Sequence, residues 1–337
     1  MVEHLKSGLS ISTHVGCQMG CDYCVLSIMG TFSKGPILED DPESIVNYLL
    51  KDDSLFVNGE TPLFINNRTD PLVPSVRDYT YRLLELCKIR NIVSPIVIIS
   101  KFAPKADLTP FFEVLRLMYV YSYSGYEHDF NFVKIDSDIQ SICRNVPSNA
   151  RFHYLRPIIP GINDKEEDIC RILNKFYEAG FAGSILAGFR VNKENRGMLM
   201  PNYDYNTQHK IFPTDKYCEL YKQMGGYYNL FRHTSCGISY FSKSCNKLGY
   251  QDRAGHCFPN CANYKICAAR RDVSSSEVIA FMGSRLPNIT KWNYAAGALL
   301  IEDEVSQEIV AFIKNALGVR VAANNLTLSL SEQLITQ

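Results

Sequence analysis

Three cysteines, at positions 17, 21 and 24 of the stretch "STHVGCQMGCDYCVLS" (12–27), have the residue type and spacing of a metal or cluster site. A closed structural zinc site, or an ordinary 4Fe-4S electron carrier, uses four protein ligands. Three thiols in one short loop therefore predict a bound metal or cluster with one coordination position open to another ligand. Two alternatives remain: a zinc site completed by His14 or a distant residue, and thiols packed in a core.

A second cysteine group lies near the other end of the chain and predicts a second metal site. Its members are Cys236, Cys245, Cys257, Cys261 and Cys267. We expect Cys236, Cys257, Cys261 and Cys267 to bind a second 4Fe-4S cluster, which leaves Cys245 as the spare. Structural zinc held by four of the five, with His256 as a further candidate, is the alternative because tetrahedral sulfur ligation serves both metals.

The first cysteine loop must be positioned by the elements around it. From residue 8 to about 190, short β-type runs alternate with helical patterns. The six strand candidates are 8–13, 62–66, 95–100, 118–124, 152–158 and 183–189. This alternation predicts an α/β fold with a parallel sheet or barrel and helices outside it. Because the cysteine loop follows the first strand, it belongs at one end of that sheet.

Two of the intervening helices carry start signals. Ser75, after Pro74, is expected to cap one helix, and Asp164 with Glu167 three residues later resembles a capping box for another.

The chain divides by composition into three predicted parts. Residues 1–200 form the barrel, and a polar, Tyr- and Asn-rich stretch begins near residue 192. Residues 201–272 form a cysteine-rich region. Residues 273–337 form a small α+β cap with a strand at 297–303, a helix at 306–318 and a strand at 319–330.

Charge and hydropathy restrict the class of protein. Of 337 residues, 35 are Lys or Arg and 35 are Asp or Glu, so the net charge of 0 offers no basic field for a nucleic-acid backbone. We expect no membrane span, because no uncharged apolar run reaches about 18 residues, and no signal peptide precedes the first strand. The expected location is the cytoplasm, where 12 cysteines favour metal binding over disulfides.

The CxxxCxxC loop directly after the first strand of a βα series resembles the signature of the radical S-adenosylmethionine (SAM) superfamily. The resemblance implies a partial (β/α)6 TIM-type barrel followed here by a cysteine-rich extension. It also implies that Cys17, Cys21 and Cys24 bind three irons of a 4Fe-4S cluster, while SAM chelates the fourth. Tyr23, before the last cysteine, matches an aromatic position near the adenine.

The segment "NRTDPLVP" (67–74) is similar to the spore photoproduct lyase-like branch of that superfamily. It follows the second strand and puts Thr69 and Asp70 where the family holds the amino group of SAM. Glu60, in "NGETP", matches the family motif better by letter but precedes the strand. For Asp70 the alternative is a simple turn residue before Pro71.

Further residues at strand ends match positions that contact SAM in the family. They are Ser100, Lys101, Ser122, Ser124, Arg156, Gly188 and Arg190. Arg156 begins "RPIIPGIND", which looks like the fifth strand of the superfamily and its following turn. A salt bridge to Asp or Glu is the alternative for Arg156.

The function implied is a radical SAM enzyme that cleaves SAM to a 5′-deoxyadenosyl radical, which abstracts hydrogen from a peptide or small-metabolite substrate. Its electron would come from a flavodoxin- or ferredoxin-type donor. A nucleoside or nucleic-acid substrate is the alternative within the superfamily. Outside it, the alternative is a non-catalytic iron-sulfur or zinc protein that senses redox state or carries electrons.

Overall fold

An eight-stranded sheet forms the body of the protein. The computed structural model describes residues 1–5, 7–24, 35–51, 59, 61–126, 134–189, 214–224, 226–244, 261–269 and 273–324. The order of the strands is β1-β2-β5-β6-β7-β8-β9-β10. They are β1 (Val2–Leu5), β2 (Gly8–Ile11), β5 (Leu63–Ile65), β6 (Ile96–Ser100), β7 (Leu117–Ser122), β8 (Arg151–Ile158), β9 (Ser184–Gly188) and β10 (Leu230–Phe231).

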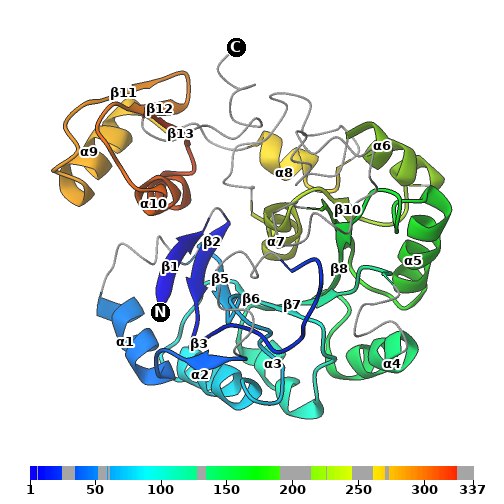
Figure 1. Cartoon of the computed structure of the whole chain (residues 1–337). Helices are drawn as coiled ribbons and strands as arrows, with labels where there is room; N and C mark the ends of the chain where they lie inside the picture. Colours follow the sequence, from blue (N-terminus) through cyan, green and yellow to red (C-terminus); the bar gives the residue numbers. More distant parts are fainter. Residues whose placement is uncertain are drawn as a thin grey trace.

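The six strands predicted from sequence are all present, and from β2 to β10 every neighbouring pair is parallel. Two strands were not expected. β1 runs antiparallel along β2, and β10 adds a two-residue parallel strand at the opposite edge. The sheet curves without closing, so the predicted α/β partial barrel is confirmed (Figure 1).

Helices cover the outer, convex side of this sheet (Figure 1). They are α1 (Pro42–Lys51), α2 (Arg77–Ile89), α3 (Phe111–Val114), α4 (Ile135–Asn145), α5 (Glu166–Glu178) and α6 (Thr214–Gln223), with a short 3-10 helix, η3 (Ala106–Leu108). Helix α7 (Thr234–Ser242) lies instead on the inner side of the curve. The arrangement creates two separate apolar layers, one on each face of the sheet.

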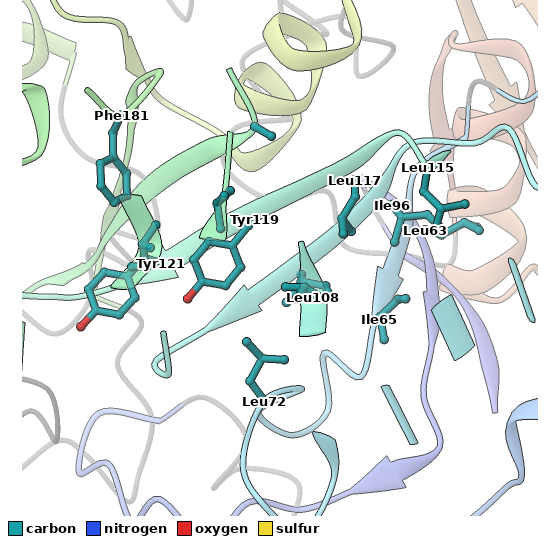
Figure 2. Close-up of a cluster of buried hydrophobic side chains, with 14 of the residues drawn as sticks. Leu63, Ile65, Leu72, Ile96, Leu108, Leu115, Leu117, Tyr119, Tyr121 and Phe181 are labelled. Carbon is teal, nitrogen blue, oxygen red and sulfur yellow. The ribbon is translucent and has the colours of Figure 1, made fainter. Parts of the chain in front are cut away.

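Alternation along the strands assigns side chains to these layers. Leu117, Tyr119 and Tyr121 of β7 face outward and belong to one buried cluster with Leu108 and Phe181, which Figure 2 shows. Met118 and Val120 face inward, where they pack with α7. We call these two sides of the sheet the outer face and the inner face.

A chain of buried polar groups crosses the outer face. His153 of β8 is fully buried, its ring is stacked on that of Phe176 with 3.7 Å between centroids, and its Nε2 lies 2.9 Å from the Tyr123 carbonyl oxygen. Because that carbonyl only accepts, Nε2 carries the proton, and Nδ1 lies 2.9 Å from the Ser184 hydroxyl oxygen. Ser184 is also bonded to the Tyr228 hydroxyl. Burial lowers the pKa of His153 to about 3.

Both predicted helix caps are wrong. Helix α2 begins after Val76 rather than Ser75, and α5 begins after Lys165; neither start has a side-chain cap. The Asp164 carboxylate accepts a hydrogen bond from the backbone N–H of Gly161 at 2.8 Å. It therefore closes the preceding turn and is not used by the helix.

A small α+β unit lies near the C-terminus. It comprises α9 (Ser275–Arg285), β11 (Trp292–Ala295), β12 (Ala298–Ile301), α10 (Gln307–Leu317) and β13 (Arg320–Ala323). The Asn315 side chain on α10 donates to the backbone carbonyls of Leu5 and Gly8 at 2.9 and 3.1 Å, which fixes the unit to β1. Residues 325–330 of its predicted last strand lie outside the described residues, as do the expected domain boundaries near 200 and 272.

Within the described ranges, no helix has both the length and the apolar character that a membrane crossing requires.

Candidate functional site

The segment between β2 and the first cysteine loop is hydrogen-bonded to the turn that follows β5. The backbone N–H of Asn66 donates to the Ile11 carbonyl, and the Asn66 side chain accepts from the backbone of Thr13 at 2.8 Å. Further along, the N–H of Gly16 donates to the Arg68 carbonyl at 3.1 Å. Two neighbouring parallel strands thus end in segments that are bonded to each other immediately before the first cysteine.

Cys17 is the anchored thiol of the loop. It is buried, whereas Cys21 and Cys24 are half-buried, and the backbone N–H groups of Met19 and Asp70 donate hydrogen bonds to its sulfur. Burial raises the pKa of the Cys17 thiol, and those two N–H groups oppose the rise. The loop turns at Gly20, whose φ of +63° suits glycine.

Across the described ranges, no three His, Cys, Asp or Glu side chains already lie close enough together to share a metal ion. Binding one cluster through all three thiols would therefore draw Cys21 and Cys24 toward Cys17. His14 lies just before the loop, where burial lowers its pKa and its Nδ1 is 2.8 Å from the Thr13 hydroxyl.

Asp70 joins the turn after β5 to the end of β6. Its carboxylate accepts from the Ser100 hydroxyl at 2.6 Å, from the backbone N–H of Lys101 at 2.8 Å and from that of Leu72 at 2.9 Å. Burial raises the pKa of this carboxyl, and the three donors act in the opposite direction. The backbone of Asp70 therefore contacts Cys17 while its side chain fixes the neighbouring strand end.

Lys101 connects that strand end back to the cysteine loop. Its ammonium donates to the Tyr23 hydroxyl at 2.5 Å and lies 5.1 Å from the centre of the Tyr23 ring. Tyr126 lies edge-on to Tyr23, with 6.1 Å between ring centroids. Tyr23, Asp70, Ser100 and Lys101 thus lie together beside the loop.

The hydroxyl of Thr69 is a buried polar group beside the loop that a cofactor could bind. The Thr69 side chain is 7% exposed, and its hydroxyl has no hydrogen-bond partner in the described part of the chain. Buried hydroxyls without partners are rare in proteins, because each costs free energy. Three thiols that form no disulfide, together with one buried hydroxyl that lacks an acceptor among the described residues, make a donor set that fits an iron-sulfur cluster with a polar cofactor beside it.

The remaining predicted residues lie further along the sheet. Ser122 ends β7 on the inner face, and Arg156 lies two strands from Lys101, on β8. Gly188 ends β9 opposite Ile158, and the carbonyl of Ser124 accepts from the Asn163 amide. Glu60 and Arg190 lie outside the described residues.

Cys236, a member of the second cysteine group, packs at the inner face. Cys236 is in α7 and Cys267 in α8 (Tyr264–Ala268), so two members of this group belong to helices rather than to the loops their sequence suggests. The Asn263 amide donates to the Cys236 carbonyl at 2.6 Å, and the Ser239 hydroxyl lies 4.0 Å from the Cys267 sulfur. The two helices are therefore neighbours. Cys245, His256 and Cys257 lie outside the described residues.

Asn263 was not foreseen from the sequence. It is 1% exposed, and within the described residues its side-chain oxygen has no partner. Its place between Cys261 and Cys267 is the one signal that could have drawn attention to it. Asn66 was missed in the same way, because its contact with Thr13 depends on how β2 and β5 align.

No protein-family model matches the chain, and no curated protein matches it. Among solved structures, a spore photoproduct lyase mutant with bound AdoMet and dinucleoside spore photoproduct matches with a TM-score of 0.47 at 12% identity, over 58% of this chain and 62% of that chain. Another mutant of spore photoproduct lyase matches with a TM-score of 0.49 at 11% identity, over 67% and 75%. Streptococcus suis SuiB bound to S-adenosylmethionine matches with a TM-score of 0.46 at 11% identity, over 70% and 52%.

The chain thus spans less than two thirds of the first of these lyase structures and about half of SuiB. With so few identical residues, the likenesses describe only the course of the chain. The functional roles proposed below come from this chain's own residues.

Proposed function

We propose that this protein is a radical SAM enzyme whose Cys17, Cys21 and Cys24 hold three irons of a 4Fe-4S cluster. The observation that carries the proposal is the set of contacts around the cysteine loop. Cys17 is bonded to the backbone of Asp70, Asp70 to the end of β6, and Lys101 back to Tyr23 of the loop. The three thiols of the loop therefore lie beside the ends of β2, β5 and β6. These are the carboxyl ends of the strands, where parallel barrels place their active sites.

Each polar group around the loop has a role that its contacts support. A carboxylate has about four acceptor positions, and Asp70 uses three, so one remains for the amino group of SAM. The Lys101 ammonium suits the carboxylate of SAM, and Tyr23 beside it offers a ring to the adenine. The buried Thr69 hydroxyl can donate to a cofactor oxygen or to a cluster sulfur.

When bound, the cluster and SAM supply the chemistry: an electron cleaves SAM to methionine and a 5′-deoxyadenosyl radical, which removes a hydrogen atom from the substrate. The protein holds both partners close together and keeps water away from the radical. We propose a peptide or small metabolite as substrate and a flavodoxin- or ferredoxin-type protein as electron donor. A nucleoside is the second choice, since the chain's net charge of 0 gives a long phosphate backbone little attraction.

The test is anaerobic turnover without substrate. The protein is reconstituted with iron and sulfide, reduced with dithionite and given SAM, and 5′-deoxyadenosine is measured by mass spectrometry. Cys21→Ala should abolish the product, whereas Cys170→Ala, which removes a half-buried thiol on α5, should not. If wild type forms no product and SAM leaves the EPR signal of its reduced cluster unchanged, the proposal is wrong and an electron carrier or sensor is favoured.

We also propose a second metal site formed by Cys236, Cys261 and Cys267 together with Cys257. Its support is the adjacency of α7 and α8 and the buried oxygen of Asn263 beside them. A second 4Fe-4S cluster is the preferred occupant and zinc the alternative. Metal analysis of a variant with Cys17, Cys21 and Cys24 all changed to Ala decides between them. Residual iron and sulfide would indicate a cluster, and residual zinc would indicate a structural ion. If the variant holds no iron and no zinc, the second site is refuted.

A further inference from the structure

The inner face of the sheet carries two cations toward the carboxyl ends of its parallel strands. The charged side chains that face inward from the described strands, and from the residue after β6, are Glu3, Lys101 and Arg156; the pairing of Glu3 with Ser10 places it on this face. Glu3 is ion-paired with Arg68 at the β1 edge of the sheet, whereas Lys101 and Arg156 lie toward the carboxyl ends of their strands. A ligand that occupies this end of the inner face therefore meets two cations.

Arg156 faces inward by alternation from Tyr154 and lies within an irregularity of β8. Leu155 pairs with Leu186 and Ile158 with Gly188, so three residues of β8 advance against two of β9. Such a bulge changes the direction of side chains and often lies beside active sites. The bulge contains Arg156, which keeps its inward direction at the open end of the strand.

The contacts of Arg156 leave most of its hydrogen-bonding capacity unused. Its guanidinium lies 5.4 Å from the centre of the Tyr154 ring, and one nitrogen is 3.4 Å from the Tyr154 hydroxyl. None of the described carboxylates forms an ion pair with it. The salt bridge that was the alternative expectation for Arg156 is therefore absent from the described part of the chain. A planar guanidinium with five donors suits an oxyanion.

Arg156 and Lys101 belong to different neighbourhoods. Lys101 is bonded to Tyr23 of the first cysteine loop. Arg156 is stacked on Tyr154, whose hydroxyl lies 3.1 Å from that of Thr234 at the start of α7, two residues before Cys236. The two strands are separated by β7, which is roughly 10 Å at about 4.8 Å per strand. SAM has a single carboxylate, and Lys101 beside the loop is the nearer cation for it.

We propose that Arg156 binds an oxyanion of the substrate, a carboxylate or a phosphate, and so positions the substrate between the SAM site and α7. This inference rests on the proposed function, because it assigns the other cation, Lys101, to SAM. It places the substrate's negative group on the β8 side of the inner face, with Tyr154 and Thr234 as its polar neighbours. Arg156 is thereby a residue that selects anionic over neutral substrates.

The test uses the reconstituted protein with SAM and ligand-observed NMR, which detects weak binding. The probes are N-acetyl-phenylalanine, its neutral amide and phenyl phosphate. Wild type should bind at least one anionic probe about tenfold more tightly than the amide, since charge-assisted hydrogen bonds contribute on that order. Arg156→Gln should remove this preference, and Arg156→Lys should keep part of it. The control is Arg171→Gln, which removes an exposed cation on α5 and should change nothing.

The outcomes separate the two proposals. A preference for the carboxylate or for the phosphate probe identifies which oxyanion the site takes, and either supports the inference if Arg156→Gln abolishes it. Equal binding of charged and neutral probes, or an unchanged preference in Arg156→Gln, overturns the inference. Loss of the SAM-induced EPR change in Arg156→Gln also overturns it, because Arg156 would then belong to SAM. Failure of SAM to alter the wild-type signal is instead a failure of the proposed function.

Discussion

His153 gives the sharpest quantitative prediction, because its protonation is coupled to folding. In the native protein burial lowers the pKa of His153 from its usual 6.5 to about 3, and Nε2–H and Nδ1 are both bonded within the sheet. In the unfolded chain the same imidazole takes up a proton below about pH 6.5. Stability should therefore be retained at neutral pH and lost as the pH falls from about 6.5 toward 3.

The magnitude follows from the two pKa values. At about pH 5 the protonated imidazole outnumbers the neutral form by roughly 30 to 1 in the unfolded chain, whereas the native imidazole remains neutral. Proton binding therefore stabilises the unfolded state by about 2 kcal/mol. At about pH 7.5 the corresponding gain is below about 0.1 kcal/mol. Lowering the pH between these values should thus remove about 2 kcal/mol from the free energy of unfolding through His153 alone.

Urea unfolding of wild type and His153→Gln, followed by circular dichroism at both pH values, isolates this contribution. The glutamine amide can still donate to the Tyr123 carbonyl but cannot titrate, so effects of other groups cancel in the comparison. Wild type should lose about 2 kcal/mol more than the variant. Equal losses would show that His153 is not buried as a neutral ring against Phe176, and the arrangement of the outer face described above would be wrong.

Other predictions concern the site and its support. Asp70→Ala should lower the free energy of unfolding by about 3 kcal/mol, because three hydrogen-bond donors lose their acceptor. It should also lower the iron content of the reconstituted protein. Wild-type values in urea titration and iron analysis would contradict these expectations. Cys17→Ala should reduce reconstituted iron much more than Cys170→Ala, and equal reductions would remove Cys17 from the site. Asn315→Ala should cost about 1–2 kcal/mol in urea unfolding by leaving two carbonyls without their donor, and an unchanged midpoint would argue against that contact. Gly237→Ala should cost about 1–3 kcal/mol by overpacking, and a neutral result would show that α7 shifts freely.

The sequence predicts those features that depend on contiguous residues. Each parallel strand is a short apolar run flanked by turn residues, and the first cysteine loop is one uninterrupted motif, so both are readable from the chain. β10 has two residues and offers no such pattern. The capping role expected of Asp164 failed because the same carboxylate can serve the turn before it as well as the helix after it.

Contacts between distant segments were beyond prediction from one sequence. The contact between Lys101 and Tyr23 joins residues far apart in the chain, and the pairing of Asn66 with Thr13 depends on the register of β2 against β5. Position after a strand predicted that Asp70 lies near the cysteine loop, and its backbone does contact Cys17. It could not show that the carboxylate is bonded to Ser100 and Lys101, because those partners come from another strand.

The close approach of α7 to the inner face has a consequence for redesign. A methyl group added at Gly237 would lie 2.9 Å from the Ile185 side chain and 3.5 Å from that of Met118. Helix α7 can therefore pack this closely on the sheet because residue 237 has no side chain. Residue 237 therefore determines how much room remains between α7 and the sheet. A larger residue here, paired with a smaller one at position 185, would change how closely α7 packs on the inner face without replacing Arg156 or any residue of the cysteine loop.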